Sequence, residues 1–418
     1  MSEPVTTIDR RRTARVVLQA AAAMLVAVLA VALPSTSPLG AAPPTTDGTT
    51  AAGLGAGWLA GQIDDGIPIQ NFGSGDWGAT LDAALALVAA NVGSAQVDAV
   101  WAAMVADRDT VADPFSSGDQ PGRLARMILL ATAIGEDPTA VGTGPGADLV
   151  TRLEALEQTS GADTGLFGTD SPTYDGAYRQ GYALAALRGA GVTTDAAATD
   201  WLVDQQCADG SWMPYRSNLA TPCAFDAVNF VGPDSNSTAA ALTGLAAQAP
   251  ASAAIAGGVT WLTTVQNTDG GWGLFPGDVS EPSSIALVWQ SLIATGTSGD
   301  ARFASKSATP LQALLTFQLG CTSPEADRGA FTYPGSNDAP NAFSTGQAVP
   351  GAAGVAFPLA PSTPTAAVPV VDCSVPTTTT TTTTTPSTPT TAATVTTTIA
   401  PSGAVRASGA ARPLTFAG

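Results

Sequence analysis

One short turn occurs twice in the chain. "QQCADGSW" (205–212) and "QNTDGGWG" (266–273) each follow a Trp-Leu pair and end in an indole after an Asp-Gly turn. The recurring positions are Gln206, Gly210 and Trp212 in the first copy, and Gln266, Gly270 and Trp272 in the second. The glutamine amide can satisfy carbonyls at a helix end or bond the next turn, the glycine permits a sharp turn, and the tryptophan covers the helix end. The repeat therefore predicts helical hairpins tied to one another.

The region around these turns divides into six such units. Each unit has an outer helix that keeps a charged face, as in "LVTRLEALEQ", and a second helix that is apolar nearly all round, as in "YALAALRGAG". A helix that is apolar on every face is buried. We therefore expect an all-α fold, an α6/α6 barrel. Its innermost helices should start near Leu81, Arg123, Tyr178, Thr238, Ser284 and Thr345. The outer helix of the second unit should begin near Trp101.

Composition changes divide the chain into four parts. Residues 1–42 carry arginines followed by an apolar run from Val16 to Leu33, which is typical of an export signal and its cleavage region. Residues 43–55 form a linker, residues 56–373 the barrel, and residues 374–418 a Thr/Pro-rich tail that we expect to be disordered, as the N-terminus should be. We expect a secreted or cell-envelope surface protein. The alternative is an uncleaved membrane anchor, which would be the protein's only membrane contact.

The four cysteines support export. An even number in an oxidising compartment pairs into disulfides. The first pair flanks one repeat and the second flanks the end of the folded region, so we predict the bridges Cys207–Cys223 and Cys321–Cys373. The alternatives are free buried thiols or a metal site. A metal site needs clustered ligands, and this spacing is too wide.

The charge and the absence of histidine exclude several functions. The formal net charge is −18, which argues against nucleic-acid or anionic-membrane partners. No histidine is present, which removes Ser-His-Asp and Cys-His catalysis and the commonest metal ligand. We expect neither a metal nor a cofactor.

The Gln-turn-Trp pattern resembles the QW motif of the squalene–hopene cyclase and protein prenyltransferase superfamily, over roughly residues 55–355. The resemblance implies a terpenoid cyclase-like toroid. The family's chemistry has no counterpart here: Asp-x-Asp-Asp and Asp-Asp-x-x-Asp are absent, as are the prenyltransferase zinc ligands. Cys207 in "QQCADG" does not match the thioester motif of the complement-like members. The resemblance therefore implies a non-catalytic member.

Ligands enter such barrels where the inner helices begin. Polar or aromatic residues near those positions are candidate ligand contacts: Asp82, Arg123, Tyr178, Arg179, Gln180, Asp226 and Trp289. Asp82 has a plainer explanation, because acids near a helix start are favoured by the helix dipole. Trp289 also suits a core position. Arg179, at the start of an apolar helix, requires a carboxylate partner or an anionic ligand.

Three functions remain open at this stage. The first is a secreted or surface protein that binds an apolar or amphipathic ligand or a protein partner. The second is an exported cyclase-like or prenyltransferase-like enzyme that uses an atypical acid such as Asp226. The third is a structural component of the cell envelope. An enzyme needs a deep pocket around a desolvated carboxylic acid, so the centre of the barrel distinguishes them.

Overall fold

The computed structural model describes residues 47–374, apart from 72, 169–174, 216–222, 227–230, 334 and 336–338. The predicted export signal, the first residues of the linker and the tail beyond residue 374 lie outside the described residues. Within the described part, no helix is both long enough and apolar enough to cross a membrane.

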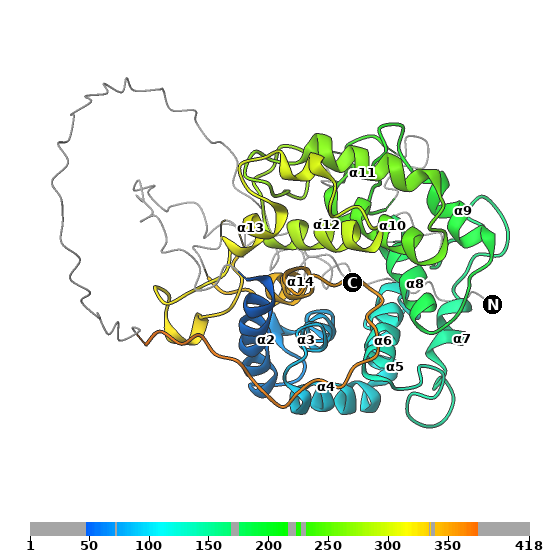
Figure 1. Ribbon diagram of the computed structural model, residues 1–418. Coiled ribbons are helices and arrows are strands. Elements are labelled where there is room, and N and C mark those ends of the chain that lie inside the picture. The colour runs from blue at the N-terminus through cyan, green and yellow to red at the C-terminus, as the bar shows by residue number, and fades with distance from the viewer. Residues whose placement is uncertain are drawn as a thin grey trace, which may run out of the picture. The chain divides into compact units, whose positions relative to one another are not determined.

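Six helices form an inner ring (Figure 1). They are α3 (Trp77–Ala89), α6 (Pro121–Ile134), α8 (Ala177–Gly189), α10 (Ser235–Gln248), α12 (Pro282–Ala294) and α14 (Ala342–Ala352). Each packs on the next, and the last packs on the first, so the ring is closed. All six predicted starts fall inside these helices. The expected α6/α6 barrel is confirmed.

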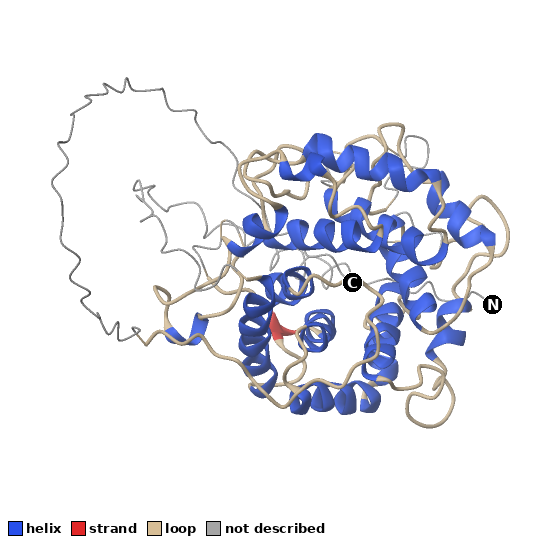
Figure 2. Ribbon diagram, viewed as in Figure 1, coloured by secondary structure: helices blue, strands red, loops and turns tan. Residues whose placement is uncertain are grey.

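The outer helices connect the inner ones along the chain. They are α2 (Gly48–Asp64), α4 (Ser94–Ala106) with the short α5 (Arg108–Ala112), α7 (Leu149–Glu154), α9 (Ala196–Asp204), α11 (Ala253–Val265) and α13 (Pro310–Leu315). Two 3-10 turns, η1 (Ala301–Ala304) and η2 (Glu325–Asp327), and one small hairpin, β1 (Gln70–Asn71) with β2 (Ser74–Gly75), complete the described elements. Helices dominate the fold (Figure 2).

Two sequence boundaries were wrong. The segment 43–55 is not all linker, because α2 already starts at Gly48, where the Asp47 side chain accepts hydrogen bonds from the first turn. Its small residues gave no apolar period from which to recognise a helix. The second outer helix begins at Ser94 instead of near Trp101, after a left-handed Gly93.

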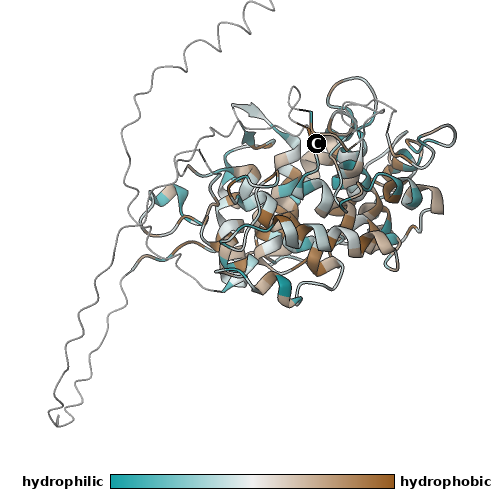
Figure 3. Ribbon diagram, turned by 90° about the horizontal axis from the view of Figure 1, so that it is seen from above, coloured by the Kyte–Doolittle hydropathy of each residue, from teal (hydrophilic) through white to brown (hydrophobic). Residues whose placement is uncertain are grey.

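Small residues bring the inner helices close together. A Cβ added at Gly181 of α8 would lie 2.1 Å from the carbonyl oxygen of Ala240 in α10, and one at Gly351 of α14 would lie 3.0 Å from Ala286 in α12. Hydrophobic stretches lie along the helices in the body of the barrel (Figure 3). Close packing of this kind leaves a narrow centre.

The repeated turn joins each hairpin to the next. Trp212 and Trp272 are fully buried. Their indole nitrogens donate to the carbonyls of Leu202 and Leu262, at 2.8 and 2.9 Å. Gln206 Nε2 donates to the turn carbonyl of Gly210 and to Ala254 at the start of the next outer helix, both at 2.9 Å. Gln266 makes the equivalent bonds to Gly270 and Phe303. We call each such contact between a turn and the following outer segment a seam.

A third glutamine closes the ring of seams. Gln318 Nε2 donates to Gly329 in its own turn and to Ala51 in α2, the first outer helix. Trp58 of α2 donates in return to the carbonyl of Ala326, at 2.9 Å. The last hairpin is therefore joined to the first by the contacts that join internal neighbours.

Both predicted disulfides are present, Cys207–Cys223 and Cys321–Cys373. The second anchors the C-terminal strap, which we define as residues 355–373. The strap crosses the end of the barrel at which the inner helices finish (Figure 1). Ser362 N donates to Ala133 O at the end of α6, and Gly93 N donates to Ala367 O.

Candidate functional site

A buried ion pair lies between two inner helices. Arg126 of α6 donates from Nε to Asp82 Oδ1 of α3 at 2.7 Å, and the two side chains are 4% and 9% exposed. The guanidinium also lies over the Tyr182 ring, 4.9 Å from its centroid. Burial opposes the charge of Arg126, but the Asp82 carboxylate outweighs it and raises the pKa of Arg126 above its usual value. The predicted site residue Asp82 thus neutralises a buried cation.

Arg123 lies one turn before Arg126, and its guanidinium has fewer hydrogen-bond partners. The residue is 8% exposed, and within the described residues Nε and Nη1 have no hydrogen-bond partner. The nearest carboxylate oxygen, Asp76 Oδ1, is 3.8 Å from Nη2. Burial, with the neighbouring charge of Arg126, lowers the pKa of Arg123 to about 10.

The residues at the start of α8 serve different purposes. Arg179 has the carboxylate partner it requires, because Nη1 lies 3.0 Å from Asp175 Oδ1 and also donates to Gln120. Tyr178 stacks against Tyr182 with centroids 5.2 Å apart. Gln180 lies at a seam: its Oε1 accepts from Phe167 N, and its Nε2 donates to the carbonyls of Gly165 and Ala198. We therefore reassign Gln180 from the candidate ligand site to the scaffold.

Asp226 and Trp289 are also placed differently from the expectation. Asp226 belongs to the loop before α10, where its backbone pairs with Val231, and it is half-buried. Trp289 is half-buried against the core and is not among the residues that line the cavity described below. On α12, the cavity is lined instead by Leu287 and Gln290.

Two fully buried carboxyls cap inner helices. Asp234 accepts from the amide and the hydroxyl of Ser237, both at 2.7 Å, at the start of α10. Burial raises the pKa of Asp234 to about 7, against the effect of these bonds. Glu281 caps α12 through the amides of Ser283 and Ser284, and burial raises its pKa too. The sequence pattern had not singled out Glu281.

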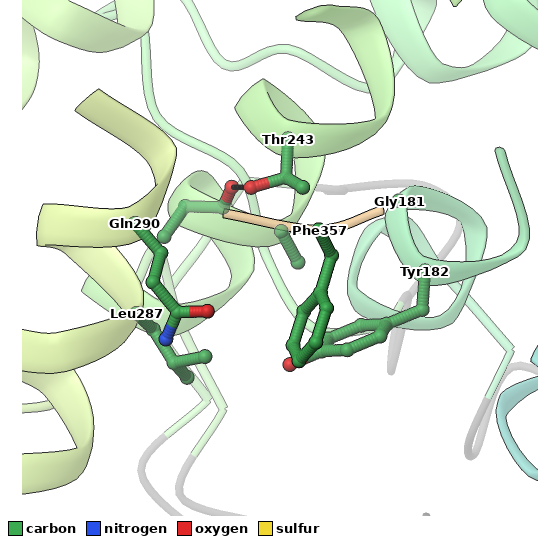
Figure 4. A pocket seen from close by; sticks show the side chains of 8 residues that line it. Gly181, Tyr182, Thr243, Leu287, Gln290 and Phe357 are labelled. Atoms are coloured by element: carbon green, nitrogen blue, oxygen red, sulfur yellow. Dashed lines mark hydrogen bonds between the residues drawn. The ribbon is translucent and has the colours of Figure 1, made fainter. Parts of the chain in front are cut away.

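A small cavity lies between α8, α10 and α12, with Phe357 of the strap on its wall (Figure 4). The cavity there has room for about one water molecule. It is lined by Gly181, Tyr182, Ala239, Ala240, Thr243, Leu287, Gln290 and Phe357. Phe357 comes from the strap, and its ring centroid lies 6.2 Å from that of Tyr182. Nothing in the sequence had marked Phe357, because its position depends on how the strap folds back.

The cavity wall retains one polar group without a partner. Gln290 Nε2 donates weakly to Gln347 O at 3.4 Å, while Gln290 Oε1 has no hydrogen-bond partner within the described part of the chain. No group of three or more potential metal ligands occurs among the described residues. The cavity that Gln290 lines is thus of a size that suits a water molecule rather than an isoprenoid.

One family model matches the part of the chain that contains the cavity-lining helices α8, α10 and α12. Residues 171–289, from just before α8 into α12, match the model of the squalene-hopene cyclase C-terminal domain. This segment of the chain is similar to that domain, and the match covers less than a third of the chain. The matched segment contains both copies of the repeated turn. No curated protein sequence matches the chain significantly.

Solved structures give a fold-level likeness. A protein from Actinoplanes is 15% identical with a TM-score of 0.50, covering 73% of this chain and 98% of that one. The ent-copalyl diphosphate synthase from Streptomyces platensis is 20% identical with a TM-score of 0.41, covering 66% of this chain. The chain spans about half the length of that synthase, 49%. The Actinoplanes likeness shows a shared fold.

Proposed function

We propose that this protein is a secreted or cell-surface toroid that binds a protein partner on its outer surface and does not cyclise isoprenoids. The observation that carries the proposal is the small size of the cavity between α8, α10, α12 and the strap. Ligand pockets for small molecules usually enclose about 300–1,000 Å³. Here the Asp82–Arg126 pair is buried between two inner helices, and the cavity that Tyr182 and Phe357 line accommodates about one water.

Export is supported by the cysteines and by the N-terminal sequence. Both disulfides join residues within the barrel domain, and disulfides persist in oxidising compartments. The arginine-led apolar run before residue 34 has the pattern of an export signal. A display role also suits the Thr-rich composition after residue 374.

Native mass spectrometry of the full exported chain, followed by cross-linking on intact cells, tests the proposal. We expect the purified protein to have the mass of the polypeptide alone, and we expect cross-links to a specific partner protein. Co-purification of a stoichiometric apolar small molecule would contradict the small-cavity interpretation and favour a ligand carrier.

An exported cyclase is the second candidate, favoured by the superfamily and by one buried acid. Asp234 has the raised pKa that a general acid at neutral pH requires, whereas the acid suggested by the sequence, Asp226, is half-buried in a loop. Incubation with squalene and prenyl diphosphates should give no cyclised product. Turnover that is lost in Asp234→Asn but retained in Asp226→Asn would establish the enzyme instead, since asparagine still caps a helix.

A further inference from the structure

The third hairpin, α7 with α8, lacks the seam glutamine that the fourth (α9 with α10), fifth (α11 with α12) and sixth (α13 with α14) hairpins have. In the fourth hairpin, Cys207 N donates to Ser211 O and Gly210 N donates to Cys207 O, both at 2.8 Å, and the residue before Cys207 is the seam glutamine. The fifth hairpin repeats this pair of bonds through Asn267, and the sixth through Leu319. Each of these residues follows a seam glutamine, which defines the position structurally.

The same two backbone bonds identify the equivalent position in the third hairpin. Gln158 N donates to Leu166 O at 2.8 Å, and Gly165 N donates to Gln158 O at 2.7 Å. The residue before Gln158 is Glu157. A carboxyl therefore stands where the next three hairpins have a carboxamide.

The displaced amide contacts are supplied from elsewhere. Gln180 of α8 donates to Gly165 O at 2.8 Å and to Ala198 O at 3.0 Å, the same kinds of acceptor that Gln206 uses. Glu157 is left to meet Asp195, the N-cap of α9, whose Oδ1 accepts from Ala198 N at 3.3 Å. Two carboxyl groups from consecutive hairpins thus meet at one seam.

We propose that Glu157 and Asp195 share one proton, and that this proton fastens the seam between the third and fourth hairpins. A carboxylate cannot donate a hydrogen bond, so Glu157 and Asp195 can bond to each other only when one of the two is protonated. Two ionised carboxylates in contact repel each other. The seam is therefore closed in acid and loosened in base.

The surrounding charges agree with this direction. Burial raises the pKa of Glu157 to about 7, and the charge of Asp195, the hydrogen bond to it and the charge of Glu154 on α7 act in the same sense. Because the folded pKa is raised above the ordinary value of 4.5, the stabilisation is complete below about pH 4.5 and is lost as the pH rises through about 7.

Hydrogen exchange of the full chain tests the shared proton. It is measured between about pH 5.5 and about pH 8.5 and corrected for intrinsic exchange. We expect the protection of residues 157–168 and 196–204 to fall by about threefold to tenfold across this range, with a midpoint near 7. Glu157→Gln should remain protected throughout, because its amide donates without a proton. Asp195→Asn should do the same, since asparagine both caps α9 and donates to ionised Glu157.

Two control variants distinguish the shared proton from general effects of charge. Glu154→Gln should lower the midpoint and keep the transition, because it removes a neighbouring charge and leaves the shared proton in place. Glu136→Gln, exposed beyond the end of α6, should change nothing. An unchanging wild type, or the same transition in Glu157→Gln, would overturn the proposal. Neither result bears on the proposed partner binding, which is tested by cross-linking.

Discussion

Gln318 Nε2 lies 2.8 Å from the carbonyl oxygen of Ala51, which is 267 positions away in the sequence. This side chain bridges the last hairpin and the first outer helix, because it also donates to Gly329 O at 3.0 Å. The ring closes because its final seam has the same chemistry as its internal ones.

Gln318→Ala should therefore loosen the closure. Two buried carbonyls would lose their donor, which costs about 1–3 kcal/mol in the free energy of unfolding. Denaturant unfolding measures the loss, and hydrogen exchange should show faster opening of α2. Gln96→Ala is the control, because Gln96 only contacts Asp64 at the exposed surface and should change stability by less than about 0.5 kcal/mol. Equal effects of the two substitutions would contradict the role of Gln318.

The turn glycines permit comparison of a matched pair. Gly270 and Gly277 have nearly equal positive φ angles, 90° and 88°. A Cβ at Gly270 would lie 2.1 Å from the carbonyl oxygen of Ala308, whereas nothing lies within 4 Å of one at Gly277. Gly277→Ala should cost only the left-handed conformation, about 1–2 kcal/mol. Gly270→Ala should cost at least about 1 kcal/mol more, by thermal or denaturant unfolding.

Trp272→Ala should lower the free energy of unfolding by about 3–5 kcal/mol, because a fully buried indole is removed. Trp272→Phe should keep much of the packing but leave Leu262 O without its donor, a loss of about 1–3 kcal/mol. Trp289→Ala is the comparison at a half-buried indole and should cost less than Trp272→Ala. A loss below about 1 kcal/mol for Trp272→Ala would show that the side chain does not support the seam.

Arg126→Leu should be strongly destabilising, by about 3–5 kcal/mol, since Asp82 would remain buried without its partner. Adding Asp82→Leu should recover a large part of that loss, because the uncompensated charge is removed as well. A double-mutant cycle by denaturant unfolding measures the coupling. Simple additivity of the two single losses would mean that the pair contributes no interaction of its own.

The fold could be predicted because its repeated turn has a short motif with fixed spacing between glutamine, glycine and tryptophan. Trp212 and Trp272 follow their glutamines at a fixed distance, so two hairpins were visible and the others could be aligned to them. Gln318 was missed because 11 positions separate it from Gly329, where four separate Gln206 from Gly210. The insertion that includes η2 changes the spacing of glutamine and glycine in the sequence, but the hydrogen bond between them is kept in the structure.

The site was harder to predict, because polar residues at helix starts have several uses. Gln180 was assigned to a ligand, yet it bonds the carbonyls of Gly165 and Ala198 at a position where the chain has Glu157, just after α7, in place of a seam glutamine. Arg179 was expected to need a carboxylate or an anion, and Asp175 provides the carboxylate. The narrow centre arises from contacts such as that between Gly181 and Ala240, which no property of a single helix reveals.

The disulfide at the end of the strap also determines how the molecule carries load. Cys373 lies just before the Thr-rich tail, and it is bonded to Cys321 on the last hairpin. Tension applied through the C-terminal part of the chain therefore passes at Cys373 into the body of the barrel. Residues 355–372, which include the cavity-lining Phe357, do not carry this tension. Pulling on the tail should leave the strap seated until the disulfide is reduced.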